Sequence, residues 1–173
     1  MTTGEFARDF VEYAAQKLEQ NRAQIARCAG LLSTGQLWSR VNPRCNSVAN
    51  LILHLTGNIR EWIVSGVGGE EFKRDRPAEF AARGPMPHVA VIEPFNATLA
   101  AAARVILGLG AAELATSRTI QGYKITAQVA VMHVVEHGSY HCGQIVHMAK
   151  AILDVDLSQY DEQGRRLVGP DVP

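Results

Sequence analysis

Apolar residues recur at steps of mostly three, four or seven in four segments of the chain, which is the spacing of amphipathic helices. The predicted helices cover about residues 2–32, 42–66, 88–108 and 126–153. Thr2 and Glu5 have the pattern of a capping box at the start of the first helix. Asn42 and Pro43 are expected to begin the second, because Asn is a favoured N-cap and Pro a favoured first helical residue.

The segments between these helices differ in character. Residues 70–87 are charged and rich in proline, which predicts a long loop of the kind that is often functional in a compact domain. Residues 117–125 (SRTIQGYKI) have the composition of an extended segment around Gly122. Residues 154–173 are polar and are expected to form a loosely held tail beside a single domain of residues 1–153. The pattern predicts an all-α four-helix bundle whose first two helices form an antiparallel pair and whose two later, long links permit crossovers.

Composition narrows the class of protein. The 173 residues are 47% hydrophobic and 20% charged, which is typical of one globular domain. Lys and Arg number 17, as do Asp and Glu, and this zero net charge argues against a nucleic-acid partner. No apolar run reaches the roughly 20 residues that span a bilayer, and the N-terminal sequence does not resemble a signal peptide. Three cysteines without paired spacing predict reduced thiols, so we expect a cytoplasmic protein without a membrane partner.

Histidines supply the candidate chemistry. His133, His137 and His141 stand at i, i+4 and i+8 of the last predicted helix. Two histidines at i, i+4 can bind one metal ion, but eight residues span about 12 Å of helix, so one ion can take only one adjacent pair. His54, at the edge of an apolar stripe in the second predicted helix, is the candidate for a further ligand. A lone buried histidine is more often a hydrogen-bonded core residue, but combined with the stripe of three it favours a metal site.

Three motifs resemble the DinB/YfiT-like superfamily of metal-binding four-helix bundles. They are NSVANLILHLTGNIREWI in the second helix, RDRPAEF (Arg74–Phe80), and HVVEHGSYHCGQI in the last helix. The resemblance covers about residues 3–153 and implies an up-down-down-up topology with long crossover connections. It implies that His54, His137 and His141 are the metal ligands and that His133 lies outside them. Gln144 shares the face of His137 and His141 and is expected to contact a ligand or the substrate.

Three neutral imidazoles leave a divalent ion its full charge and an open coordination position, which is typical of catalytic zinc sites. Zn²⁺ is the expected ion and Ni²⁺ the alternative, because imidazole suits both. Such an ion can activate water, as in a hydrolase, or a thiol, as in a thiol S-transferase. The resemblance favours the transferase, with a small-molecule substrate, since characterised relatives use low-molecular-weight thiols. The alternative function is a non-catalytic metal-binding or stress-related scaffold, in which the site would be closed or the cavity plugged.

Other polar residues have weaker assignments. Asn58, one turn after His54, is expected to line the pocket, and Glu61 either orients a ligand or faces solvent. Three arginines are candidates to anchor an acidic substrate or thiol: Arg60, Arg74 and Arg76. Ion pairing with Asp75 and Glu79 inside the loop is the favoured interpretation of these arginines.

The third predicted helix and its end carry more apolar residues than one buried face requires. These residues are Val89, Val91, Ile92, Phe95, Leu99, Val105, Ile106, Leu107 and Leu109. The surplus predicts a homodimer that buries about 800 Å² on each partner. The alternative is that the loop 70–87 and the C-terminal tail cover this surface within one chain.

Overall fold

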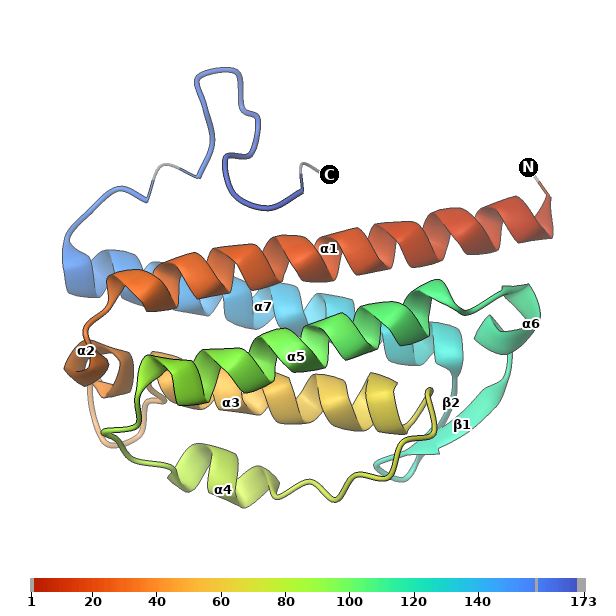
Figure 1. The fold of residues 1–173 in the computed structure, drawn as a ribbon, viewed down its shortest axis with the longest axis horizontal. Helices are drawn as coiled ribbons and strands as arrows, with labels where there is room; N and C mark the ends of the chain where they lie inside the picture. Colours follow the sequence, from red (N-terminus) through yellow and green to blue (C-terminus); the bar gives the residue numbers. More distant parts are fainter. Residues whose placement is uncertain (1, 158, 171–173) are drawn as a thin grey trace.

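The computed structural model describes residues 2–157 and 159–170. Four long helices lie side by side: α1 (Thr3–Leu31), α3 (Val48–Ile59), α5 (His88–Leu107) and α7 (Ala127–Leu153) (Figure 1). A π-helical turn, η1 (Arg60–Ser65), extends α3. Helices α1 and α7 run in one direction and α3 and α5 in the other, as Figure 1 shows. The prediction of an all-α bundle with up-down-down-up topology is therefore confirmed.

The order of the helices around the bundle differs from one expectation. Both α1 and α3 pack against α5 and α7, so α1 and α3 face each other across the diagonal. They run antiparallel, but the prediction that they form a neighbouring pair is wrong. The connection between them contains a short helix, α2 (Thr34–Trp38), and is long enough to cross the end of the bundle. This arrangement makes α3 and α7 antiparallel neighbours.

The starts of the first two long helices show what local sequence can decide. At α1, the Thr2 hydroxyl accepts from Glu5 N–H and the Glu5 carboxylate accepts from Thr2 N–H, so the predicted capping box is confirmed. The predicted start at Asn42-Pro43 is wrong, because α3 begins at Val48 with Ser47 as its N-cap. Residues 42–45 instead form a turn, in which the N–H of Cys45 donates to the carbonyl of Asn42.

The segment 70–87 is not loop throughout, because it contains helix α4 (Arg76–Ala81). The Asp75 carboxylate caps this helix by accepting from Ala78 N–H, and a proline lies in its first turn. The amide of Asn50, buried in α3, donates to the carbonyls of Glu79 and Ala82. These bonds hold α4 against α3, one turn from His54.

The extended segment predicted at 117–125 is a β-hairpin. Strands β1 (Ser117–Ile120) and β2 (Tyr123–Thr126) pair antiparallel, after the one-turn helix α6 (Ala111–Leu114). Gln121 and Gly122 form the turn with positive φ angles of 51° and 82°. The hairpin leads directly into α7, whose N-cap is Thr126.

Helix α5 accounts for most of its apolar residues within one chain. Val91, Phe95, Leu99 and Ile106 are buried, whereas Val89 is 62% exposed and Leu107 53%. Because α5 packs against α1 on one side and α3 on the other, it needs two apolar stripes. Helices α1 and α3 therefore bury much of the apolar surface of α5 within one chain. The homodimer stays a prediction, which the molar mass from light scattering tests.

Among the described residues, α5 is also the one helix long and apolar enough to cross a membrane by length and composition. Its place between α1 and α3 in the bundle explains this apolar character without a membrane. Beyond α7, Leu157 is buried and the carbonyl of Pro170 accepts from the amide of Gln20 in α1. Part of the predicted tail therefore contacts the bundle, and its residues 158 and 171–173 lie outside the described residues.

Candidate metal centre

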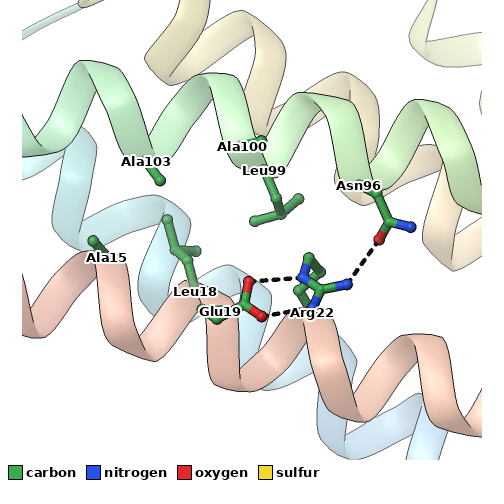
Figure 2. A pocket seen from close by; sticks show the side chains of 8 residues that line it. All are labelled: Ala15, Leu18, Glu19, Arg22, Asn96, Leu99, Ala100 and Ala103. Atoms are coloured by element: carbon green, nitrogen blue, oxygen red, sulfur yellow. Dashed lines mark hydrogen bonds and ion pairs between the residues drawn. The ribbon is translucent and has the colours of Figure 1, made fainter. Parts of the chain in front are cut away.

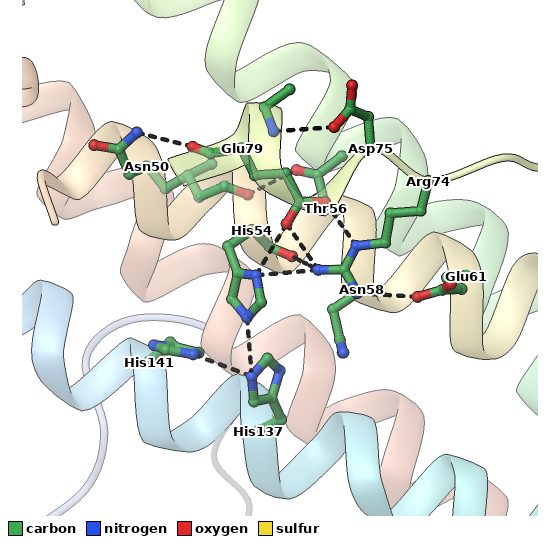
Figure 3. Close-up of polar contacts among 12 residues, drawn as sticks. Asn50, His54, Thr56, Asn58, Glu61, Arg74, Asp75, Glu79, His137 and His141 are labelled. Carbon is green, nitrogen blue, oxygen red and sulfur yellow. Dashed lines mark hydrogen bonds and ion pairs between the residues drawn. The ribbon is translucent and has the colours of Figure 1, made fainter. Parts of the chain in front are cut away.

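The neighbouring helices α3 and α7 bring three histidines together (Figure 3). His54 Nε2, from α3, lies 3.2 Å from His137 Nε2 of α7, and His141 Nε2 lies 3.1 Å from the same atom. One helical turn separates His137 from His141. The candidate ligand atoms of the three side chains all lie within 4.8 Å of one another, which is a spacing that one metal ion can bridge.

The partners of the other ring nitrogens define the tautomers. His54 Nδ1 lies 3.0 Å from Glu79 Oε2, and an ionised carboxylate can only accept, so Nδ1 carries the hydrogen. Arg74 Nη2 lies equally close to Nδ1, but a bare Nδ1 would bring its lone pair against the carboxylate. His141 Nδ1 lies 2.7 Å from Gln144 Oε1, while the Gln144 amide nitrogen donates to Tyr140. With a hydrogen on Nδ1 and none on Nε2, the rings of His54 and His141 direct the lone pairs of their Nε2 atoms toward His137.

The electrostatics of the site favour neutral rings at His137 and His141. Burial, followed by the positive charge that His141 and His54 would carry, lowers the pKa of His137 to about 3. Burial also lowers the pKa of His141, although the hydrogen bond with Gln144 opposes this. A proton on His137 Nε2 can be shared well with only one of the two facing lone pairs. A cation satisfies all three nitrogens at once, so the residues present fit a metal ion.

An ion pair behind His54 holds its ring. Arg74 donates to both oxygens of Glu79, at 2.6 Å from Nε and 2.8 Å from Nη2, and its Nη1 donates to Glu61 at 3.0 Å. The Arg74 side chain is only 4% exposed. Burial alone would raise the pKa of Glu79, but the hydrogen bonds from Arg74 and His54 bring it below its ordinary value. An ionised Glu79 thus fixes the orientation of His54 and increases the basicity of its Nε2.

Two neighbouring features position this ion pair. A Cβ on Gly57 would overlap Glu79 Oε1 and lie 2.9 Å from Arg74 Nε, so only glycine lets the pair lie this close to α3. Glu61 lies in the π-helical turn η1, where it also accepts from Gln121 at the tip of the hairpin. The hairpin, η1 and α4 are in this way linked to His54 through Arg74.

His133 lies outside the group of three. Its Nε2 is 3.4 Å from Asn58 Nδ2, and its ring stands 3.9 Å from the ring of Trp62. Asn58 contacts His133 and does not line the pocket in front of the three histidines. Within the described part of the chain, His137 Nδ1 and Asn58 Oδ1 are buried and have no hydrogen-bond partner.

A pocket of about 620 Å³ opens in front of His54, His137 and His141. Leu51, Phe80 and Met148 supply apolar walls, and Gln144 lines it beside His141. The turn at residues 42–45 and helix α4 form its opposite side. The three histidines therefore face a cavity large enough for a small organic molecule.

The sequence of the chain also identifies its family. Residues 5–160 match the family model described as "Protein of unknown function (DUF1572)". The chain belongs to the DUF1572 family. This family is part of the DinB-like superfamily, so the resemblance found in the three sequence motifs is confirmed. No curated protein sequence matches the chain.

Solved structures show the same fold. A DinB-like protein from Bacillus cereus ATCC 10987 has a TM-score of 0.64 at 15% identity, over 82% of this chain and 89% of that one. A conserved protein from Enterococcus faecalis has a TM-score of 0.61 at 13% identity, over 90% of this chain and 99% of that one. At these identities the likeness establishes the DinB-like fold alone.

A second cavity of this DUF1572 chain has a different character (Figure 2). It measures about 290 Å³ and lies between α1 and α5. The guanidinium of Arg22 donates to Glu19 at 2.6 Å and to Asn96 Oδ1 at 3.2 Å. Leucine and alanine side chains form the other walls. Because its one cation is already paired, this cavity offers no group for a ligand.

Sequence reasoning missed the role of Glu79. The expected ion pairing inside the segment 70–87 is found for Arg74 with Glu79, but Asp75 caps α4 and Arg60 pairs with Glu70. The available signal was the short helix itself, because Asp75 and Pro77 form a helix start two residues before Glu79. That Glu79 reaches His54 depends on how the segment folds back onto α3.

Proposed function

We propose that the chain binds one divalent metal ion through the Nε2 atoms of His54, His137 and His141. The observation that carries this proposal is the convergence of three imidazole Nε2 atoms, at 3.1 and 3.2 Å, with the tautomers of His54 and His141 set by Glu79 and Gln144. Without a cation, lone pairs face one another in a partly buried site. Zn²⁺ is the proposed ion and Ni²⁺ the alternative, because three neutral imidazoles suit both.

We further propose a metal-dependent enzyme rather than a scaffold. A scaffold is expected to close its site or fill its cavity, whereas here the three histidines face a pocket of about 620 Å³. A divalent ion with an open position supplies charge that stabilises a thiolate or activates water. The chain contributes the orientation of His54 by Glu79 and of His141 by Gln144, and apolar walls that exclude water from the bound substrate.

Of the two proposed reactions, the lining favours thiol S-transfer over hydrolysis. None of the described residues that line the pocket is an aspartate or glutamate, and Glu79 is occupied by Arg74 and His54. Hydrolysis commonly relies on a carboxylate to take a proton from water. A thiol loses its proton far more readily than water does, so thiol transfer needs no such base.

Elemental analysis of protein purified without an affinity tag tests metal binding. We expect about one equivalent of metal in the wild type and in His147→Ala, which changes the pocket wall but not the triad. His54→Ala and His137→Ala should lose the metal. Undiminished metal in both of these variants would contradict the site. The zinc-loaded protein is then assayed for conjugation of 2-mercaptoethanol to 1-chloro-2,4-dinitrobenzene and for hydrolysis of p-nitrophenyl acetate.

A further inference from the structure

Two arginines on the open side of the pocket define the class of molecule that it takes. We infer that the pocket binds a small organic anion, whose carboxylate or phosphate group is held by Arg44 and Arg76 while its apolar part lies against Leu51 and Phe80. This inference rests on the proposed function for what the other end of the ligand meets, and adds the ligand's charge and shape.

Arg76 is the one of the three candidate arginines that remains available. Arg74 is buried against Glu79 and Glu61, and Arg60 pairs with Glu70 on the surface. Arg76 forms no ion pair with any residue of the described ranges. Its guanidinium carbon lies 5.3 Å from the centre of the Phe80 ring, so a cation–π contact keeps it on the pocket side of α4.

Arg44 reaches the same pocket from another part of the chain. It belongs to the turn at residues 42–45, where its backbone N–H donates to Asn42 Oδ1 at 2.9 Å. Its guanidinium likewise has no carboxylate partner in the part of the chain that the structure describes. Two cations from separate segments thus line one cavity.

The pocket lacks any negative charge to balance these cations. The described residues that line it include no aspartate or glutamate. A divalent ion on the histidines would add further positive charge to the same space. Arginine binds carboxylate and phosphate groups through paired, charge-assisted hydrogen bonds, which makes an anion the matching ligand. Leu51 and Phe80 then favour an apolar segment between the anionic group and the histidines.

Binding of thiols that differ only in their far end tests the inference. The probes are 6-mercaptohexanoate, 6-mercaptohexyl phosphate and the neutral 6-mercapto-1-hexanol, titrated calorimetrically into the zinc-loaded protein. All three probes carry the same thiol, so a difference between their affinities reports the group at the far end. We expect the better of the two anions to bind roughly tenfold more tightly than the alcohol, and the two anions to show whether carboxylate or phosphate is preferred.

Substitutions assign the preference to the arginines. Arg44→Gln and Arg76→Gln should each lose most of the advantage of the anions and leave the affinity for the alcohol unchanged. Arg76→Lys should restore part of it, and Arg60→Gln, which removes an arginine outside the pocket, should change nothing. Equal affinity for anions and alcohol in the wild type would overturn the inference, as would an unchanged preference in both glutamine variants.

Two different measurements separate a failure of the proposed metal site from a failure of the proposed anion site. Metal content by elemental analysis reports the proposed function, whereas the ratio of anion to alcohol affinity reports the anion site. The same titrations in His137→Ala separate the two. If this variant has lost the metal but still prefers the anions in an arginine-dependent way, the result supports the inference. A wild-type protein that holds no metal and shows no preference for anions would contradict both proposals.

Discussion

The histidine pocket and the cavity between α1 and α5 both lie between elements of one bundle and both contain arginine, yet their polar atoms are paired differently. Between α1 and α5, Arg22 is paired with Glu19 one turn away (Figure 2), and the hydrogen bonds that its guanidinium donates to the Glu19 carboxylate raise the pKa of Arg22. In front of α3 and α7, three Nε2 atoms converge and two arginines have no carboxylate partner among the described residues.

The cavities also have different origins. Between α1 and α5, alanines at positions 15, 100 and 103 leave a gap because their side chains are short. The histidine pocket lies between α7 on one side and residues of the turn at 42–45 and of helix α4 on the other. Cavity volume alone therefore does not mark a binding site. A site is marked by polar groups that converge without forming hydrogen bonds with one another, because burying unpaired polar groups costs free energy.

The largest expected effect removes the centre of the histidine group. His137 Nε2 is the atom that the Nε2 atoms of His54 and His141 both face. His137→Ala should therefore weaken metal binding by more than about a hundredfold, which exceeds the usual cost of losing an outer contact. His133→Ala should retain the metal, because His133 Nε2 faces Asn58 instead. Elemental analysis at matched folding by circular dichroism checks this. Equal loss in both variants would place His133 among the ligands.

Replacing one carboxylate in each region by an amide tests whether Glu79 supports metal binding. Glu79→Gln keeps an acceptor for His54 but removes the charge that increases the basicity of its ring. Metal affinity should fall roughly 10- to 100-fold. Glu19→Gln removes the corresponding carboxylate from the α1–α5 cavity and should leave the affinity unchanged. Competition with a chromogenic zinc chelator measures both. An equal change of zinc affinity in the two variants would show that Glu79 does not support metal binding through His54.

Acid should destabilise the metal-free protein through the histidine pocket. His137 has a pKa of about 3 when folded and about 6.5 when unfolded, so the unfolded chain binds more protons between these values. Stability is therefore lost as the pH falls below about 6.5, at up to roughly 1 kcal/mol per pH unit, until about pH 3.

His137→Gln is the control for this prediction, since glutamine does not titrate. Urea unfolding at pH 7, 6, 5 and 4 measures the free energy of unfolding of the metal-free wild type and of the variant. The value for the wild type should fall relative to that for the variant as the pH falls. A difference that stays constant over this range would mean that His137 is not held neutral by its surroundings.

The smallest expected effect concerns a glycine beneath the Arg74–Glu79 pair. Alanine normally stabilises a helix interior by up to about 1 kcal/mol relative to glycine. Gly143→Ala in α7, where a Cβ would have open space, should show this gain. Gly57→Ala should instead destabilise by about 1 to 2 kcal/mol, because its Cβ overlaps Glu79. Thermal unfolding compares the two, and a gain at both positions would show that the ion pair can move aside freely.

Local sequence determined much of this protein. Apolar periodicity places the four long helices, and the capping box at Thr2 sets the start of α1, because both depend on residues within one or two turns. The spacing of His133, His137 and His141 likewise fixes which pairs share a helical face. The same reasoning was wrong at Asn42-Pro43. The helix starts instead at the capping box of Ser47 and Asn50, and the Asn50 amide also donates to the carbonyl of Glu79 in α4.

Tertiary structure decided the rest of the candidate site. Periodicity leaves open whether His54 meets His133 and His137 or His137 and His141, because that depends on the rotation and offset between α3 and α7. Only the folded-back segment brings Glu79 to His54 and Arg76 to the pocket that Arg44 lines. These contacts join residues 25 or more positions apart, and the packing of whole elements, rather than any local preference, sets distances of that kind.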